Sequence, residues 1–97
     1  MYTTNNILAN QEYQNLQVKH LVQFENYEVL SISFEEGCLF PDHVSPRDCG
    51  LLVLEGKIFL YIDKNEYQIY RHQVFDIKAE VSHRVRALAN SKFLIIR

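Results

Sequence analysis

The sequence has no tryptophan and only two cysteines, two prolines and three glycines among its 97 residues. Two cysteines are too few for the disulfide framework that stabilises many small secreted domains. No stretch approaches the roughly 20 apolar residues that a membrane-spanning helix needs, and no segment shows a sustained helical period. These absences exclude a disulfide-rich scaffold and a membrane-spanning helix, and they argue against a domain built from helices.

The sequence also lacks a cluster of basic residues. Its formal net charge is −2, and its 10 Lys and Arg residues are scattered along the chain. Nucleic-acid-binding domains concentrate such residues on one face, so we expect no nucleic-acid partner and no membrane partner. Residues 1–10 contain no basic segment and only three consecutive apolar residues, unlike a secretory signal peptide. We therefore expect a cytoplasmic protein whose Cys38 and Cys49 stay reduced.

What is present is the balance of a globular domain, with 47% hydrophobic and 23% charged residues. The length is that of one domain. Residues 1–15 are polar apart from a short apolar spot, and we expect them to form a loosely held arm or a single turn of helix. Residues 16–97 are expected to form one β-barrel domain.

From Leu16 onwards, apolar and polar residues alternate in short segments, with turn signals about every 8 to 12 residues. This pattern predicts about nine strands, with any helix confined to the arm, in a barrel or two-sheet jelly roll that hides its strand edges. Asn65 is the expected left-handed residue of a hairpin loop. The expected strands are 16–24, 27–36, 38–46 with bends at its prolines, 49–54, 57–62, 67–70, 74–77, 83–88 and 92–96.

The alternation also predicts which side chains point inward. Cys49 shares a face with apolar residues of 49–54, and His83 shares a face with apolar residues of 83–88. His20 lies on the apolar face of 16–24, which we expect to be half-buried.

The segment from Gly37 to Gly56 contains every glycine, proline and cysteine of the sequence. It runs from Gly37 through five residues to His43, then Val44 and Ser45, three residues, Cys49, six residues and Gly56. This spacing resembles the first motif of the single-domain cupins, small RmlC-like jelly-roll barrels, in which glycine is followed by His-x-His, glutamate and glycine. The resemblance extends from about Leu30 to the end of the chain.

The second cupin motif is kept only at His83. His72 and Glu80 stand where that motif has glycines, Lys78 where it has proline, and Ala87 where it has asparagine. The resemblance implies an all-β, double-stranded β-helix fold. It also implies that this histidine belongs to the same interior site as the residues of the first motif.

In the cupins, a metal is typically held by two histidines and a glutamate of the first motif and the histidine of the second. Position by position, the resemblance places His43, Ser45, Cys49 and His83 in an interior ligand pocket, with His83 facing His43 across it. His43, His83 and Cys49 are then candidate ligands of one divalent transition metal: Zn, Fe, Ni, Mn or Cu. The alternative is that the metal site is lost and the histidines are neutral core residues.

Three functions stay open. The first is a barrel that binds a small molecule in its interior. The second is a metal-dependent enzyme of the dioxygenase or isomerase kind that uses His43 and His83. The third is a homodimeric interaction module with a vestigial pocket, paired through the strand 16–24, which lies outside both motifs. No general acid or base can be assigned from these residues, so whether the protein is an enzyme is open.

Overall fold

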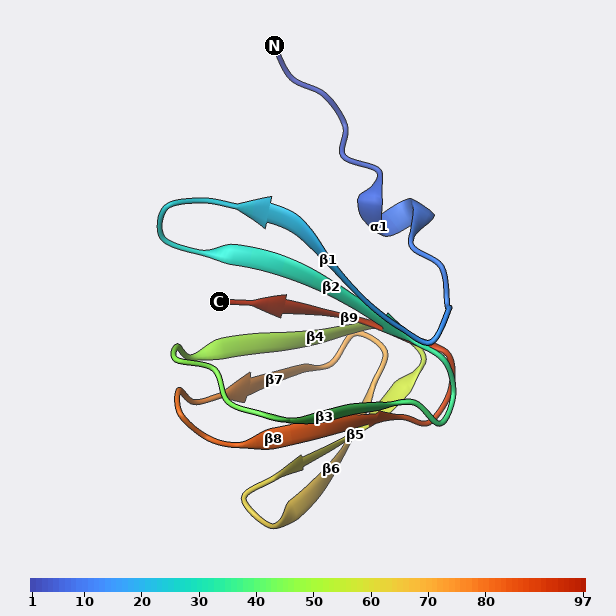
Figure 1. The fold of residues 1–97 in the computed structure, drawn as a ribbon, viewed down its shortest axis with the longest axis vertical. Helices are drawn as coiled ribbons and strands as arrows, with labels where there is room; N and C mark the ends of the chain where they lie inside the picture. Colours follow the sequence, from blue (N-terminus) through green and yellow to red (C-terminus); the bar gives the residue numbers. More distant parts are fainter.

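The computed structural model describes all 97 residues. Two antiparallel sheets pack face to face, and one short helix lies outside them (Figure 1). The five-stranded sheet has the order β1-β2-β9-β4-β7, and the four-stranded sheet has the order β3-β8-β5-β6. With its only helix four residues long, the protein has no helix able to cross a bilayer. The elements are α1 (Ile7–Asn10), β1 (Leu16–Gln23), β2 (Glu28–Phe34), β3 (Leu39–His43), β4 (Cys49–Glu55), β5 (Lys57–Ile62), β6 (Asn65–Tyr70), β7 (Val74–Ile77), β8 (His83–Ala87) and β9 (Ser91–Ile96).

The predicted nine strands and the single helical turn within residues 1–15 are confirmed. β5 and β7 have the predicted bounds, and the other strands differ from the prediction by a few residues at their ends. The prediction for Asn65 is wrong, because this residue already begins β6. The left-handed residues are Asp63, with φ 54°, and Lys64, with φ 66°. A two-residue hairpin loop of type I′ has positive φ at both central positions, so the left-handed residues are the two between β5 and β6.

The core lies between the two sheets and contains 13 buried apolar residues. Phe34 of β2 and Phe93 of β9 meet edge to face, with their ring centroids 5.5 Å apart. On β5, Ile58 and Leu60 are fully buried. Since these residues come from both sheets, burying them fixes how the sheets face each other and where the strand ends lie.

The expected half-burial of β1 is wrong. Leu16 and Val18 pair with the buried Phe34 and Ile32 of β2, so they lie on the inward side, yet 36% and 46% of their surfaces are exposed. β1 is the edge strand of the five-stranded sheet, which explains why little packs against it. His20 of the same strand is exposed as well.

Residues of the N-terminal arm cover part of the outer face of the five-stranded sheet. Gln11 is only 5% exposed, and its Nε2 donates to the carbonyl oxygens of Ser31 at 3.1 Å and Gln17 at 3.3 Å. The hydroxyl of Ser31 donates back to Gln11 Oε1, and Ser33 Oγ donates to the carbonyl of Glu12 at 2.9 Å. The arm is therefore tied to β2 by a buried network of hydrogen bonds.

Candidate functional site

A cavity of about 180 Å³ lies between the two sheets, at the end of the sandwich where β3 and β9 end and β4 and β8 begin. Its apolar lining comes from β1, β2, β3 and β9. The C-terminus of the chain lies at the same end (Figure 1). The polar residues that line the cavity are His43, Ser45, Cys49, His83 and Arg97. The structure thus brings all four residues predicted for a pocket to one cavity, together with an arginine.

His43 and His83 are cross-strand partners on β3 and β8. Their ring centroids are 4.1 Å apart and their planes are inclined by 62°. The expectation that they face each other across the interior is therefore wrong. β3 and β8 are hydrogen-bonded neighbours in the four-stranded sheet, so the two histidines lie side by side on one wall.

A bulge in β3 places His43 on the inner face. Phe40 pairs with Val85 and His43 pairs with His83, and the register shifts between these two pairs. β3 thus takes three residue steps where β8 takes two, and the extra residue resets the alternation of side chains. Phe40 and His43 both line the cavity, although strict alternation would put them on opposite faces. Pro41, which lacks an N–H to donate to a ladder, lies in the bulge.

Each histidine ring is oriented by a carbonyl two residues before it. Nδ1 of His43 lies 2.9 Å from the carbonyl oxygen of Pro41, and Nδ1 of His83 lies 3.0 Å from that of Val81. A carbonyl oxygen only accepts hydrogen bonds, so each Nδ1 carries the proton and donates. In the neutral ring, the lone pair then lies on Nε2. The two rings therefore offer hydrogen-bond acceptors, not donors, through Nε2.

The Nε2 atom of His83 has no hydrogen-bond partner in the protein, although the residue is only 3% exposed. No fully buried side-chain nitrogen or oxygen in the protein lacks a partner, so this Nε2 must have an accessible surface. Because His83 lines the cavity, we infer that a molecule in the cavity can donate a hydrogen bond to this Nε2 atom.

Ser45 and Cys49 are both buried, at 2% and 7% exposure. The hydroxyl oxygen of Ser45 accepts a hydrogen bond from the Arg47 N–H at 3.3 Å, which leaves its own proton free to be donated. Burial raises the pKa of the Cys49 thiol above its ordinary value of 9.0. The thiol is therefore protonated and uncharged near neutral pH.

Arg97 lines the cavity but was not among the residues predicted from the sequence. Its Nε donates to Glu28 Oε1 at 2.8 Å, and this hydrogen bond lowers the pKa of the Glu28 carboxyl group. Alternation in the last strand could have predicted its position, because Arg97 has the same parity as Phe93 and Ile95. Phe93 is buried in the core and Ile95 lines the cavity.

The metal prediction concerns His43, His83 and Cys49, which all line this cavity. No group of three or more His, Cys, Asp or Glu side chains is placed to hold a metal ion. His43, His83 and Cys49 line one cavity but are not assembled as a three-ligand site, and no carboxylate joins them. The donor set therefore does not fit the three-ligand catalytic arrangement of zinc. A bound divalent metal stays a prediction, for which the two histidines are the available ligands.

The protonation of His43 should make the stability of the fold depend on pH. Burial lowers the pKa of His43 below its ordinary value of 6.5, and the neighbouring His83 lowers it further, against the hydrogen bond to Pro41. Between 6.5 and the lowered pKa, the unfolded chain binds a proton that the folded protein does not bind. We therefore expect the free energy of unfolding to decrease as the pH falls below 6.5, and to show no contribution from this ring above that range.

Urea denaturation of metal-free protein between pH 8 and pH 5 measures this effect. His43→Asn should show a smaller decrease than the wild-type protein, because the substituted side chain does not titrate. An unchanged pH profile in this variant would show that another group causes the decrease.

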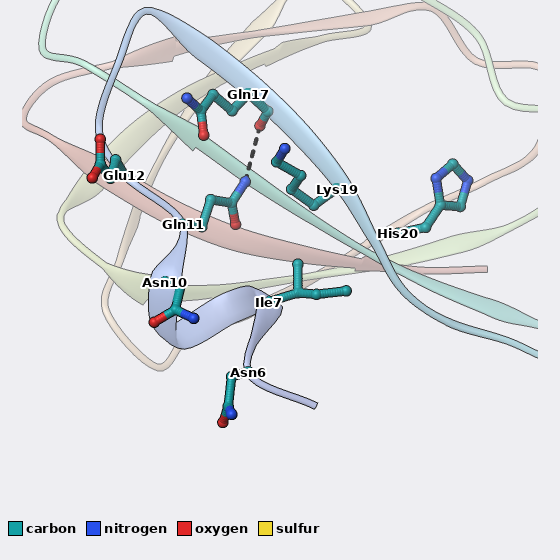
Figure 2. Close-up of a pocket in the computed structure, with 8 residues that line it drawn as sticks. All are labelled: Asn6, Ile7, Asn10, Gln11, Glu12, Gln17, Lys19 and His20. Atoms are coloured by element: carbon teal, nitrogen blue, oxygen red, sulfur yellow. Dashed lines mark hydrogen bonds between the residues drawn. The ribbon is translucent and has the colours of Figure 1, made fainter. Parts of the chain in front are cut away.

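A second pocket, of about 640 Å³, lies outside the sandwich between the arm and β1 (Figure 2). Figure 2 shows Gln11 directed at the main-chain oxygen of Gln17, while His20 lies farther along β1. Ile7 is its one hydrophobic lining residue. Ligand pockets are usually largely apolar with a few convergent polar groups, so the cavity between the sheets is the better candidate.

Comparison with known proteins identifies the fold. A Desulfovibrio desulfuricans RmlC-like cupin has a TM-score of 0.86 at 22% identity, over 99% of this chain and 95% of its own. A Desulfitobacterium hafniense cupin superfamily protein has a TM-score of 0.82 at 18% identity, over 90% and 80%. A Leptotrichia buccalis cupin 2 conserved barrel domain protein has a TM-score of 0.85 at 28% identity, over 94% of this chain but 45% of its own.

No protein-family model and no curated protein matches the sequence. The structural likenesses nevertheless show that the chain has the fold of a small cupin domain, so the predicted all-β jelly roll is confirmed.

Proposed function

We propose that the protein binds a small organic molecule in the cavity between its two sheets. The observation that carries this proposal is the convergence of His43, Ser45, Cys49, His83 and Arg97 on one apolar-walled cavity. An apolar pocket with a few placed polar groups is the usual form of a small-molecule site. The volume of about 180 Å³ lies below the roughly 300–1,000 Å³ of drug-sized pockets, so the ligand is small.

The state of His83 supports a ligand, not only packing. The Nε2 atom of this ring has no partner in the protein, and because the ring lines the cavity, this acceptor is satisfied by whatever fills the cavity. Either ordered water or a ligand must therefore satisfy it. A ligand that carries a hydrogen-bond donor can take the place of that water.

Nuclear magnetic resonance of 15N-labelled protein with a panel of acids, amides, alcohols and amines of up to about eight non-hydrogen atoms tests the proposal. We expect at least one class to shift the resonances of cavity residues in a saturable way. His83→Ala and His43→Ala should abolish these shifts while the protein stays folded. A matched control is His72→Asn, since His72 is exposed and outside the cavity.

Two results would contradict small-molecule binding. One is a panel in which no compound shifts the cavity resonances. The other is a complete loss of folding in both alanine variants, because the histidines would then serve the core. Elemental analysis of the purified protein decides the metal-dependent alternative in parallel. A metal that is present in the wild-type protein and lost in both variants would favour that alternative.

The outer face of the five-stranded sheet suggests a second property, self-association. Apolar residues face outward on each of its strands and lie in register: Val22, Val29 and Ile96 in one row, and Leu94, Leu52 and Val74 in the next. Exposure reaches 66% at Val74 and 42% at Ile96. We propose that two copies pair through this face, because exposed apolar residues that lie next to one another mark an interaction surface.

Light scattering after size-exclusion chromatography measures the mass in solution. We expect twice the monomer mass of 11.5 kDa, and we expect Val74→Glu to shift the protein towards the monomer. Leu39→Glu is the control, since Leu39 is exposed on the other sheet. A wild-type mass of one chain at micromolar concentration would refute the pairing.

A further inference from the structure

Arg97 is the only Arg, Lys, Asp or Glu residue that lines the cavity. Its Nε is occupied by Glu28, whereas neither Nη atom forms a hydrogen bond with the protein. The guanidinium group is planar and carries five N–H donors, so its terminal nitrogens keep donors available. The side chain is 32% exposed, which places it between the cavity and solvent. An arginine in this state is suited to bind a carboxylate.

The two histidines on the wall formed by β3 and β8 offer hydrogen-bond acceptors, whereas Arg97 offers donors. His43 and His83 each donate through Nδ1 to a main-chain carbonyl, so their Nε2 atoms accept in the neutral rings. A carboxylate is itself an acceptor and does not pair with such atoms. Their natural partner is a hydroxyl or other donor on the ligand.

The remaining lining limits the size and charge of the ligand. The Cys49 thiol is uncharged near neutral pH because burial raises its pKa, so it does not repel an anion. The hydroxyl of Ser45 has a proton to donate. The other walls are aliphatic or aromatic, and they would bury a short carbon skeleton. The volume of about 180 Å³ excludes a nucleotide or a coenzyme.

We infer that the ligand is a small hydroxycarboxylic acid, whose carboxylate is bound by Arg97 and whose hydroxyl donates to Nε2 of His83 or His43. This inference rests on the proposed small-molecule binding and names the chemical class that the cavity takes. The carboxylate is held by a donor at the solvent-accessible side, and the hydroxyl by acceptors on the buried wall.

The experiment compares three molecules of nearly equal size by titration, with 15N-labelled histidine rings as the reporter. Lactate has both groups, propionate lacks the hydroxyl, and lactamide lacks the charge. We expect lactate, or its shorter homologue glycolate, to bind about tenfold or more tightly than either comparison molecule, because each lost hydrogen bond leaves a buried group unpaired. Nε2 of the histidines should shift with lactate and less with propionate.

Substitution of the arginine separates its role from that of the fold. Arg97→Gln should weaken lactate binding about tenfold or more and leave lactamide binding unchanged, while Arg97→Lys keeps the charge and should recover part of the affinity. Arg84→Gln is the matched control. Arg84 lies on the outer side of the four-stranded sheet over the ring of Tyr61, 4.7 Å from its centroid, and its loss should change nothing.

The outcomes distinguish this inference from the proposed function. If lactamide binds in the cavity as tightly as lactate, or if Arg97→Gln has no effect, the ligand class is wrong and small-molecule binding stands. If no member of the wider panel shifts the cavity resonances, the proposed function fails and the inference fails with it. A preference for propionate over lactate would overturn the role of the histidine acceptors and with it the hydroxycarboxylic-acid class, while small-molecule binding would stand.

Discussion

Replacing Gly56 with alanine is expected to lower the free energy of unfolding by about 3–5 kcal/mol, through backbone strain and overpacking together. Gly56 joins β4 to β5 with φ 78°, a conformation that costs an L-residue energy. A Cβ atom there would lie 2.3 Å from Ser91 Oγ and 2.4 Å from the carbonyl oxygen of Asn90. The second of these atoms is main chain, so the clash cannot be relieved by rotating a side chain.

The other two glycines provide graded controls. At Gly50, a Cβ atom would meet nothing within 4 Å and φ is not positive, so Gly50→Ala should leave stability almost unchanged. At Gly37, there is also open space but φ is 87°, so Gly37→Ala should cost about 1 kcal/mol from the backbone alone. Urea denaturation of all three variants measures how much each one lowers the free energy of unfolding. Equal losses at Gly56 and Gly37 would show that the close approach of Asn90 and Ser91 to Gly56 contributes nothing.

Replacing Gln11 with alanine is expected to cost about 2–3 kcal/mol, the second largest effect. The Gln11 amide satisfies the carbonyl oxygens of Ser31 and Gln17 and accepts from the Ser31 hydroxyl. Removing it leaves the buried groups of Ser31 unpaired unless water enters. We therefore expect weaker attachment of residues 1–15, seen as faster cleavage of the arm in limited proteolysis and as a lower urea midpoint.

Gln14→Ala is the matched control for the arm, since Gln14 is exposed and forms no side-chain hydrogen bond. It should leave both proteolysis and the urea midpoint unchanged. If Gln11→Ala behaves like the control, the arm is held by Lys92 and Ser33, whose contacts with it remain.

The fold was predictable from the sequence because its signals are local. Alternation located the strands, and the spacing from Gly37 to Gly56 identified the jelly roll. Even where the second motif has lost its glycines, the backbone keeps their conformation, with φ 69° at His72 and 66° at Glu80. The exposure of β1 was not predictable, since alternation indicates which face is apolar but not whether another layer covers it. The burial of Ser31 was missed for the same reason.

The candidate site was predictable in part. Cys49 and His83 lie inward as alternation predicts, and the motif spacing brought His43 to the same cavity. Arg97 was missed because a charged residue is by default assigned to solvent. That the two histidines are neighbours could not be read from the chain, because strand pairing between β3 and β8 is a long-range property.

Because β3 contains a bulge, the position of His43 beside His83 depends on the number of residues between Phe40 and His43. Pro41 and Asp42 are exposed and have no partners of their own in the β3–β8 register. An insertion or deletion of a single residue here would place Phe40 and His43 on opposite faces of the sheet and separate their rings, whose centroids are now 4.5 Å apart. The number of residues between Phe40 and His43 therefore determines whether the cavity keeps both acceptors.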